Sequence, residues 1–340
     1  MVIRTYRGFG SHREICLFGR VLRQSEVGGR FNRGDLLVDL IALWRRMWRR
    51  GVRHAVVEVS FGGARQRSKT DRFGFFFIRL PILPPDGPDR LWHRAVLEVS
   101  PPNGEPVRAE TDVLVAPRSA EYVVISDIDD TVVYTGVAQK IKMLWHLFFA
   151  KAGSRVAFPG VGEFYRALHR GASGEQRNPL LYVSRGPWSI YGALEAFFHL
   201  HDIPIGPVLY LRYWGMTVDH PLPRKAKDHK LAIIRHMLEV YGNMAFVLIG
   251  DSGQKDPEIY SRIVREYPGR IRAIYIREVG PALERRHAIA TMAREAAPSG
   301  TEFLLAADSH TMAVHAARQG LIDEEAVAEV LTECRARALS

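Results

Sequence analysis

A short apolar run that ends in a cluster of aspartates constrains the fold of this chain more than any other feature of its sequence. Residues 122–126, YVVIS, are mostly β-branched or aromatic, and Asp127, Asp129 and Asp130 follow them directly. A run of this length and composition predicts a strand that is buried on both faces of a parallel sheet. Because like charges so close together repel, we expect a positive group among the three carboxylates.

Apolar runs alternate with amphipathic stretches from residue 119 to the end of the chain. This alternation predicts a Rossmann-like, doubly wound α/β domain over residues 119–340, built on a parallel sheet. The strands that we expect are 122–126, 180–184, 245–250, 272–276 and 302–307. The helices that we expect are 161–170, 188–201, 227–241, 256–267 and 284–297.

Residues 1–118 show a different pattern, with apolar runs separated by turn sequences such as PPDGPD and PPNGEP. This pattern predicts a small β-sandwich domain, joined to the α/β domain by the linker APRSAEY. The strands that we expect are 14–22, 54–61, 73–80, 92–100 and 111–116. One amphipathic helix is expected over residues 35–50, with arginines at its C-terminal end. Such a helix fits packing on its own sheet or binding to an anionic membrane.

The charge of the chain is concentrated in the first domain. Residues 1–118 contain 21 Lys and Arg against 12 Asp and Glu, whereas residues 119–340 contain 26 against 25. A basic domain suggests an anionic partner such as a membrane surface, although a surplus that serves solubility explains the same balance. We expect no nucleic-acid partner, because the sequence contains no zinc finger, RNA-recognition signature or helix-turn-helix pattern.

Cysteine usage and the N-terminal sequence predict a cytoplasmic protein, with peripheral membrane association as a further expectation. Cys16 and Cys334 lie far apart in the sequence, which fits a reducing compartment and neither a disulfide framework nor a zinc site. The first twenty residues are polar and interrupted by arginine, unlike a signal peptide. No apolar run approaches the ~20 residues of a membrane-spanning helix.

Chemically capable residues stand at the ends of three expected strands, where open α/β sheets bind their ligands. They are Asp127, Asp129 and Thr131 after the first strand, Ser184 at the end of the second, and Asp251 and Asp256 after a later one. A lysine-rich helix start, PRKAKDHKLAII, precedes that later strand. Carboxylates, a hydroxyl and a lysine together fit phosphoryl transfer.

The chemistry of phosphoryl transfer gives each of these groups a role. A carboxylate nucleophile and a phosphate monoester repel each other, so the sequence predicts Mg²⁺, which prefers oxygen ligands, between them. Asp127 can attack phosphorus, while Asp129 can protonate the leaving alcohol and then activate water. Ser184 can donate a hydrogen bond to a phosphoryl oxygen, and a lysine can offset the negative charge.

These motifs resemble those of the haloacid dehalogenase superfamily: D-x-D-x-T, a serine at a strand end, a downstream lysine and G-D-x-x-x-x-D. More narrowly, SDIDDTVVYTGV, YVSRGPW, HKLAII and LIGDSGQKDPEIY resemble the actin-patch type of Mg²⁺-dependent phosphatidate phosphatase and its bacterial relatives. The resemblance spans roughly residues 120–320. It implies a haloacid dehalogenase-type sheet domain and hydrolysis of phosphatidate to diacylglycerol and phosphate through a phosphoaspartyl intermediate.

The resemblance also implies the role of each site residue. It makes Asp127 the nucleophile and Asp129 the general acid and base, with Ser184 and Lys230 in the second and third motifs and Lys227 as the alternative lysine. It implies a Mg²⁺ ion held by the Asp127 carboxylate, the Asp129 backbone carbonyl and Asp251, with Asp256 as a further metal candidate. We assign substrate binding to Thr131, Arg185 and Gly186.

Several of these assignments have a plainer alternative. Asp256 precedes Pro257 and equally fits the N-cap of a helix, and Arg185 equally fits a solvated or structural arginine. Residues 138–153, in which lysines flank a run of apolar and aromatic side chains, fit a cap that touches lipid or ordinary packing on the domain. For the function as a whole, the alternative is a phosphatase of the same type that acts on a soluble phosphomonoester.

Overall fold

The computed structural model describes most of the chain, in two compact units that are considered separately here. The described residues are 1–23, 51–84, 89–101, 104–128, 131, 158–184, 188, 191–210, 226–280 and 282–338. The described residues up to Ala116 form the first unit, and those from Pro117 on form the second. The expected helix 35–50, the segment 138–153 and the residues Asp129, Asp130, Arg185 and Gly186 lie outside the described residues.

The first unit consists of β-strands joined in one hydrogen-bonded network. Its strands are β1 (Val2–Thr5), β2 (Gly8–Gly10), β3 (Glu14–Leu22), β4 (Val56–Phe61), β5 (Ala64–Lys69), β6 (Phe75–Pro81), β7 (Trp92–Val99) and β8 (Val107–Val115). The order is β1-β3-β2-β8-β7-β4-β5, and β6 pairs with β3. The expected sandwich therefore takes the form of one continuous sheet, because the long β3 pairs with β6 along one edge and with β1 and β2 along the other.

The core of the first unit is formed by strands in which buried and exposed side chains alternate. In β4 and β6, buried residues alternate with more exposed ones, as expected for a sheet with one face turned to an apolar interior. Val57, Val59, Ile78 and Leu97 are among the side chains that fill this core.

The second unit contains a parallel sheet of six strands. They are β9 (Tyr122–Asp127), β10 (Leu180–Ser184), β11 (Val208–Tyr210), β12 (Ala245–Asp251), β13 (Ile271–Arg277) and β14 (Glu302–Ala306). Every pairing in this sheet is parallel, and the order is β11-β10-β9-β12-β13-β14. All residues of β9 and β10 are buried, as the continuous apolar runs predict.

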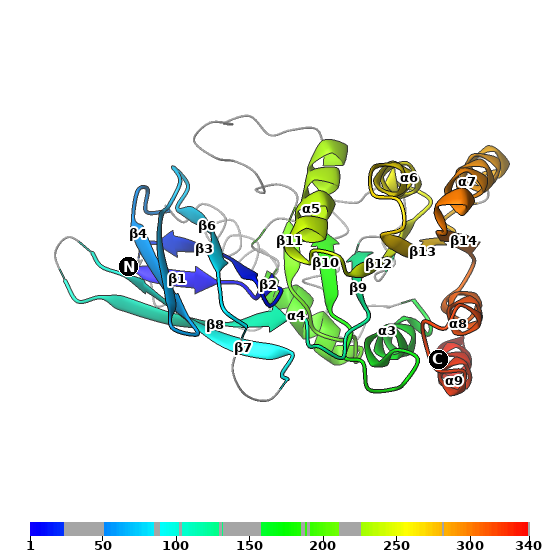
Figure 1. Cartoon of the computed structure of the whole chain (residues 1–340), viewed down its shortest axis with the longest axis horizontal. Helices are drawn as coiled ribbons and strands as arrows, with labels where there is room; N and C mark the ends of the chain where they lie inside the picture. The colour runs from blue at the N-terminus through cyan, green and yellow to red at the C-terminus, as the bar shows by residue number, and fades with distance from the viewer. Residues whose placement is uncertain are drawn as a thin grey trace, which may run out of the picture. The chain divides into compact units, whose positions relative to one another are not determined.

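Helices lie on both sides of this sheet, which confirms the expected α/β class. They are α3 (Val161–Arg170), α4 (Tyr191–Leu200), α5 (Ala226–Val240), α6 (Asp256–Glu266), α7 (Leu283–Ala296), α8 (Ser309–Arg318) and α9 (Glu325–Ala338). Figure 1 shows α5, α6 and α7 along one side of the sheet and α3, α8 and α9 along the other. None of the helices in the described residues has the length and apolarity needed to cross a bilayer.

The strand order places β9 at the point where the direction of winding changes. From β9 the chain adds β10 and β11 on one side and then β12, β13 and β14 on the other. Helices leave opposite faces at such a point, so a crevice opens outside the carboxyl ends of the central strands. The fold thus positions Asp127, the last residue of β9, where a ligand site is expected.

Candidate active site

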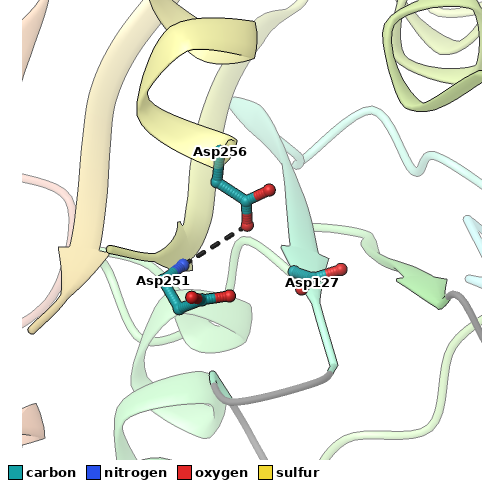
Figure 2. Close-up of side chains that lie close together, drawn as sticks. All are labelled: Asp127, Asp251 and Asp256. Carbon is teal, nitrogen blue, oxygen red and sulfur yellow. Dashed lines mark hydrogen bonds between the residues drawn. The ribbon is translucent and has the colours of Figure 1, made fainter. Parts of the chain in front are cut away.

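Three buried carboxylates meet at the carboxyl ends of the two central strands. Asp127 ends β9, Asp251 ends β12, and Asp256 is the first residue of α6. All three are 0% exposed, and each offers an oxygen within 4.8 Å of the others (Figure 2). They come together because β9 and β12 are paired in parallel, with Ser126 opposite Ile249.

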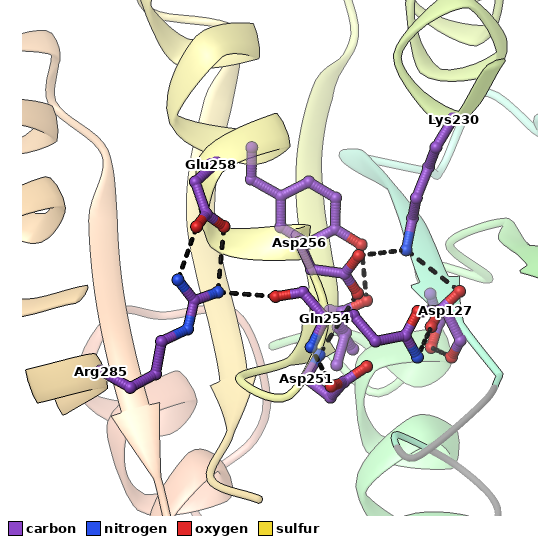
Figure 3. Close-up of polar contacts among 10 residues, drawn as sticks. Asp127, Lys230, Asp251, Gln254, Asp256, Glu258 and Arg285 are labelled. Atoms are coloured by element: carbon purple, nitrogen blue, oxygen red, sulfur yellow. Dashed lines mark hydrogen bonds and ion pairs between the residues drawn. The ribbon is translucent and has the colours of Figure 1, made fainter. Parts of the chain in front are cut away.

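Lys230 of α5 supplies a positive group beside Asp127, as expected, whereas Asp129 and Asp130 of the predicted cluster lie outside the described residues. Its ammonium nitrogen lies 3.0 Å from Oδ1 of Asp127 and 2.6 Å from Oδ1 of Asp256, and the side chain is 1% exposed (Figure 3). Burial by itself lowers the pKa of Lys230, but the carboxylates of Asp127 and Asp256 outweigh it and raise the pKa above its ordinary value. The lysine is therefore charged and fixes both carboxylates. Lys227 belongs to the same helix, but its side chain lies outside the described residues.

Asp256 makes two contacts within the cluster and does not cap α6. The N-cap is Lys255, and Asp256 stands one position later, so the capping interpretation is wrong by one residue. Its Oδ1 accepts a hydrogen bond from Lys230, and its Oδ2 accepts one from the backbone N–H of Asp251 at 3.3 Å. Asp256 thereby ties together the lysine and the end of β12.

Gly250 leaves the space that the Asp256 carboxylate occupies. A Cβ atom at this position would lie 2.3 Å from Oδ2 of Asp256 and 2.7 Å from its Cβ. Carbon atoms do not approach an oxygen or another carbon so closely without displacing it. The glycine that precedes Asp251 is therefore required by close packing inside the cluster.

Gln254 is a site residue that the sequence did not predict. Its side-chain amide nitrogen donates to Oδ2 of Asp127 at 3.3 Å, and its backbone N–H donates to Oδ1 of Asp251 at 2.8 Å (Figure 3). It belongs to the loop between Asp251 and Asp256, so its place between two predicted site residues was the one available signal. Its two hydrogen bonds link the carboxylates of neighbouring strands.

Of the remaining predicted site residues, the structure describes two, Ser184 and Thr131. Ser184 ends β10 and is 1% exposed; since Val183 pairs with Asp127, the serine lies at the same edge of the sheet, one residue further on. Thr131 is equally buried, and its carbonyl oxygen accepts a hydrogen bond from Nε of Arg277 at 3.3 Å. Asp129, Arg185 and Gly186 lie outside the described residues, so their contacts stay predictions.

Arg277 is a second residue that the sequence did not predict. It ends β13, is 3% exposed, and donates from Nη2 to the hydroxyl of Ser309 at 2.8 Å. Its guanidinium also lies over the ring of Phe158. Burial lowers the pKa of Arg277 to about 10, so the side chain is still charged at neutral pH.

The donor set of the cluster fits a hard divalent cation. Carboxylate oxygens are the ligands that Mg²⁺ prefers, and it is usually bound through one or two of them together with water and substrate phosphate. Within the described part of the chain, Asp127, Asp251 and Asp256 form the one group of acidic, histidine or cysteine side chains close enough to share an ion. The three carboxylates fit Mg²⁺ because they offer oxygen ligands and are buried close together.

Comparison with known proteins places this cluster inside a recognised region. Residues 122–278 match the model of the family described as "Phosphatidate phosphatase APP1, catalytic domain". The phosphatidate phosphatase APP1 of Saccharomyces cerevisiae is 29% identical over 178 residues, which are 51% of this chain and 29% of the yeast protein. The uncharacterized protein C29B5.04c of Schizosaccharomyces pombe is 28% identical over 159 residues, 46% of this chain and 25% of that protein.

The match covers a part of each protein. It corresponds to less than a third of the length of the curated relatives. Among solved structures, the carbohydrate acetylesterase XAC1771 from Xanthomonas citri aligns with a TM-score of 0.31 and 13% identity over 92% of this chain and 72% of that one, too low a likeness to inform the fold. Residues 122–278, which hold the whole carboxylate cluster, are therefore similar to the catalytic domain described for phosphatidate phosphatase APP1.

Proposed function

We propose that this chain is a Mg²⁺-dependent phosphatidate phosphatase, with a haloacid dehalogenase-type catalytic domain, that hydrolyses phosphatidate to diacylglycerol and phosphate. The observation that carries the proposal is the buried carboxylate cluster of Asp127, Asp251 and Asp256 with Lys230, which lies inside the segment related to APP1. Burial of three acids around one lysine is costly for folding alone, and such arrangements are concentrated at functional sites.

Asp127 is the nucleophile in this proposal. One of its carboxylate oxygens attacks phosphorus, the bond from phosphorus to the glyceride oxygen breaks, and a phosphoaspartate forms. The leaving alkoxide takes a proton from Asp129, which then accepts one from the water that attacks the phosphoaspartate and releases inorganic phosphate. Lys230, at 3.0 Å from Oδ1 of Asp127, orients the nucleophile and places a positive charge beside it.

Asp127 and Asp251 are the carboxylates that would hold the Mg²⁺ ion, together with the backbone carbonyl of Asp129. When bound, Mg²⁺ supplies positive charge that screens the carboxylates from the substrate phosphate. Asp256 has a hydrogen bond on each of its oxygens, to Lys230 and to the N–H of Asp251, which supports a positioning role for it. Ser184, Thr131, Arg185 and Gly186 would then face the phosphoryl group.

Docking of the first unit on an anionic membrane, and a cytoplasmic location, remain predictions. In the described residues of the first unit, four arginines pair with glutamates on neighbouring strands, which neutralises part of the positive charge that the docking would use. These pairs are Arg67 with Glu58, Arg79 with Glu14, Arg94 with Glu110, and Arg108 with Glu98.

Phosphate release from vesicles that contain phosphatidate tests the proposal. Wild-type protein should release phosphate with Mg²⁺ and lose this activity in EDTA. The Asp127→Asn variant should lose it at any Mg²⁺ concentration, because the amide preserves the shape of the side chain and removes its nucleophilic charge. A near wild-type rate for Asp127→Asn would rule out the nucleophile, and faster turnover of soluble phosphomonoesters than of phosphatidate would favour the alternative substrate class.

A further inference from the structure

Arg285 of α7 holds the loop that joins two of the clustered carboxylates, Asp251 and Asp256. This loop, residues 252–255, joins the end of β12 to the start of α6. The guanidinium of Arg285 donates from Nε to the carbonyl oxygen of Ser252 at 2.8 Å and from Nη2 to that of Gln254 at 2.6 Å. Both carbonyls belong to the turn between Asp251 and Asp256, so Arg285 fixes the backbone of that turn. Figure 3 shows the contact with Gln254.

Glu258 of α6 holds the guanidinium in place. Nη1 of Arg285 donates to one carboxylate oxygen of Glu258 at 2.5 Å, and Nη2 donates to the other at 3.0 Å. Burial alone raises the pKa of Glu258, but the hydrogen bonds from Arg285 lower it below the ordinary value, so the pair is ionised at neutral pH. A two-point pair of this kind restricts the orientation of the guanidinium far more than a single contact does.

Gln254 connects this clamp to the reactive groups. Its carbonyl oxygen accepts from Arg285, its N–H donates to Asp251, and its side chain donates to Asp127. Any shift of the Gln254 backbone therefore moves hydrogen bonds on two carboxylates that belong to different strands. Arg285 itself reaches neither of them.

We propose that Arg285, supported by Glu258, is a positioning residue that sets Gln254 and, through it, the carboxylates of Asp127 and Asp251 in the arrangement that binds the divalent cation and reacts. The inference rests on the proposed function, since it concerns the same site. It adds α7, which contributes no predicted site residue, to the elements that determine the geometry of the site. The competing interpretation is that Arg285 only ties α7 to α6 and contributes stability.

Two variants and a matched control separate these interpretations. Arg285→Ala removes the clamp, and Arg285→Lys keeps the charge but loses the fork that reaches the two carbonyls and Glu258. Arg286→Ala is the control, because Arg286 is the next residue of α7 and its exposed side chain pairs with Glu278 and with none of residues 252–255. For each full-length variant, the Mg²⁺ dissociation constant is measured by calorimetry with Mg²⁺ alone, kcat and KM with phosphatidate vesicles, and the unfolding temperature by circular dichroism.

We expect Arg285→Ala to weaken Mg²⁺ binding and to lower kcat by up to about 10-fold each, because Arg285 acts through Gln254 and a direct partner of metal ligands is usually worth about 10–100-fold. KM should change little, and Arg285→Lys should fall between Arg285→Ala and the wild type. Arg286→Ala should match the wild type in both quantities. If Arg285→Ala does not fold, Glu258→Gln, which leaves Arg285 present but less firmly held, should change both quantities in the same direction and by a smaller factor.

A lower unfolding temperature with unchanged Mg²⁺ affinity and kcat in the Arg285 and Glu258 variants would overturn the positioning role and leave the proposed function standing. A wild-type protein that binds no Mg²⁺ and releases no phosphate would overturn the proposed function, and this inference with it.

Discussion

Replacement of Lys230 by methionine tests the charge balance of the site directly. The change keeps much of the length of the side chain and removes a buried charge that contacts both Asp127 and Asp256. Without the ammonium group, three carboxylates with oxygens within 4.8 Å of one another remain buried together. The metal-free variant should therefore be less stable than the wild type.

The distances set the size of this effect. At an effective dielectric constant of about 20, the attraction of Lys230 is about 5.5 kcal/mol to Asp127 at 3.0 Å and about 6.4 kcal/mol to Asp256 at 2.6 Å. The free energy needed to remove these charges from water offsets much of that attraction. Removal of one partner from a buried ion pair typically costs about 3–5 kcal/mol, and we expect a loss in this range.

Urea unfolding of the full chain, followed by circular dichroism, measures the loss. The transition that Mg²⁺ shifts in the wild type reports the second unit. In EDTA the midpoint of this transition should lie at a lower urea concentration for Lys230→Met than for the wild type. Mg²⁺ at about 100 times its dissociation constant stabilises a protein that binds it by about 2.7 kcal/mol, so added Mg²⁺ should restore part of the loss. Lys255→Met is the control, because Lys255 is an exposed lysine near the same site, and its effect should stay below about 0.5 kcal/mol.

An unchanged transition for Lys230→Met in EDTA would show that the lysine does not balance the buried acids. The electrostatic description of the site would then be wrong, whatever the activity of the variant.

Two further variants test packing and capping in the second unit. Gly250→Ala should lower phosphate release at least tenfold and destabilise the fold by about 1–3 kcal/mol, because the added Cβ would lie 2.3 Å from Oδ2 of Asp256. Wild-type activity of this variant would contradict the prediction. Gly192→Ala is the control, because a Cβ added at Gly192 meets no atom within 4 Å. Asp308→Ala should lower the free energy of unfolding by about 1 kcal/mol at pH 7, because Asp308 caps α8 by accepting from the N–H of Thr311 at 2.7 Å. Burial raises the pKa of Asp308, but the hydrogen bonds from Thr311 leave it below the ordinary value, so this stabilisation is present above about pH 4 and is lost as the pH falls through the folded-state pKa. Urea unfolding of wild type and Asp308→Ala at pH 7 and about pH 3 checks this, and an equal difference at both pH values would refute the charged cap.

Elements with a strong local pattern could be predicted from the sequence. The strand β10 and the helix α3 have the predicted bounds, because a continuous apolar run and a clear amphipathic face identify them without any knowledge of their neighbours. The strand β5, with the sequence ARQRSK, was missed because it lies at the end of its sheet and has no apolar face. The helices α8 and α9 were missed because small and polar residues are mixed around them.

In the site too, residues marked by a local sequence pattern could be predicted, and residues that depend on distant contacts could not. Asp127 and Asp251 could be predicted because they end buried strands, and Lys230 because it stands in a recognisable stretch. Arg285 and Arg277 could not, since their partners lie 33 residues away at Ser252 and 146 residues away at Thr131. Contacts of this kind are created by the fold, and no pattern along the chain records them.

A crystal grown with Mn²⁺ in place of Mg²⁺ tests most directly whether Asp127 and Asp251 share one divalent cation. The anomalous difference map should show a single strong peak in bonding contact with a carboxylate oxygen of each. A map with no peak at this cluster, at a Mn²⁺ concentration that supports phosphate release, would contradict the account.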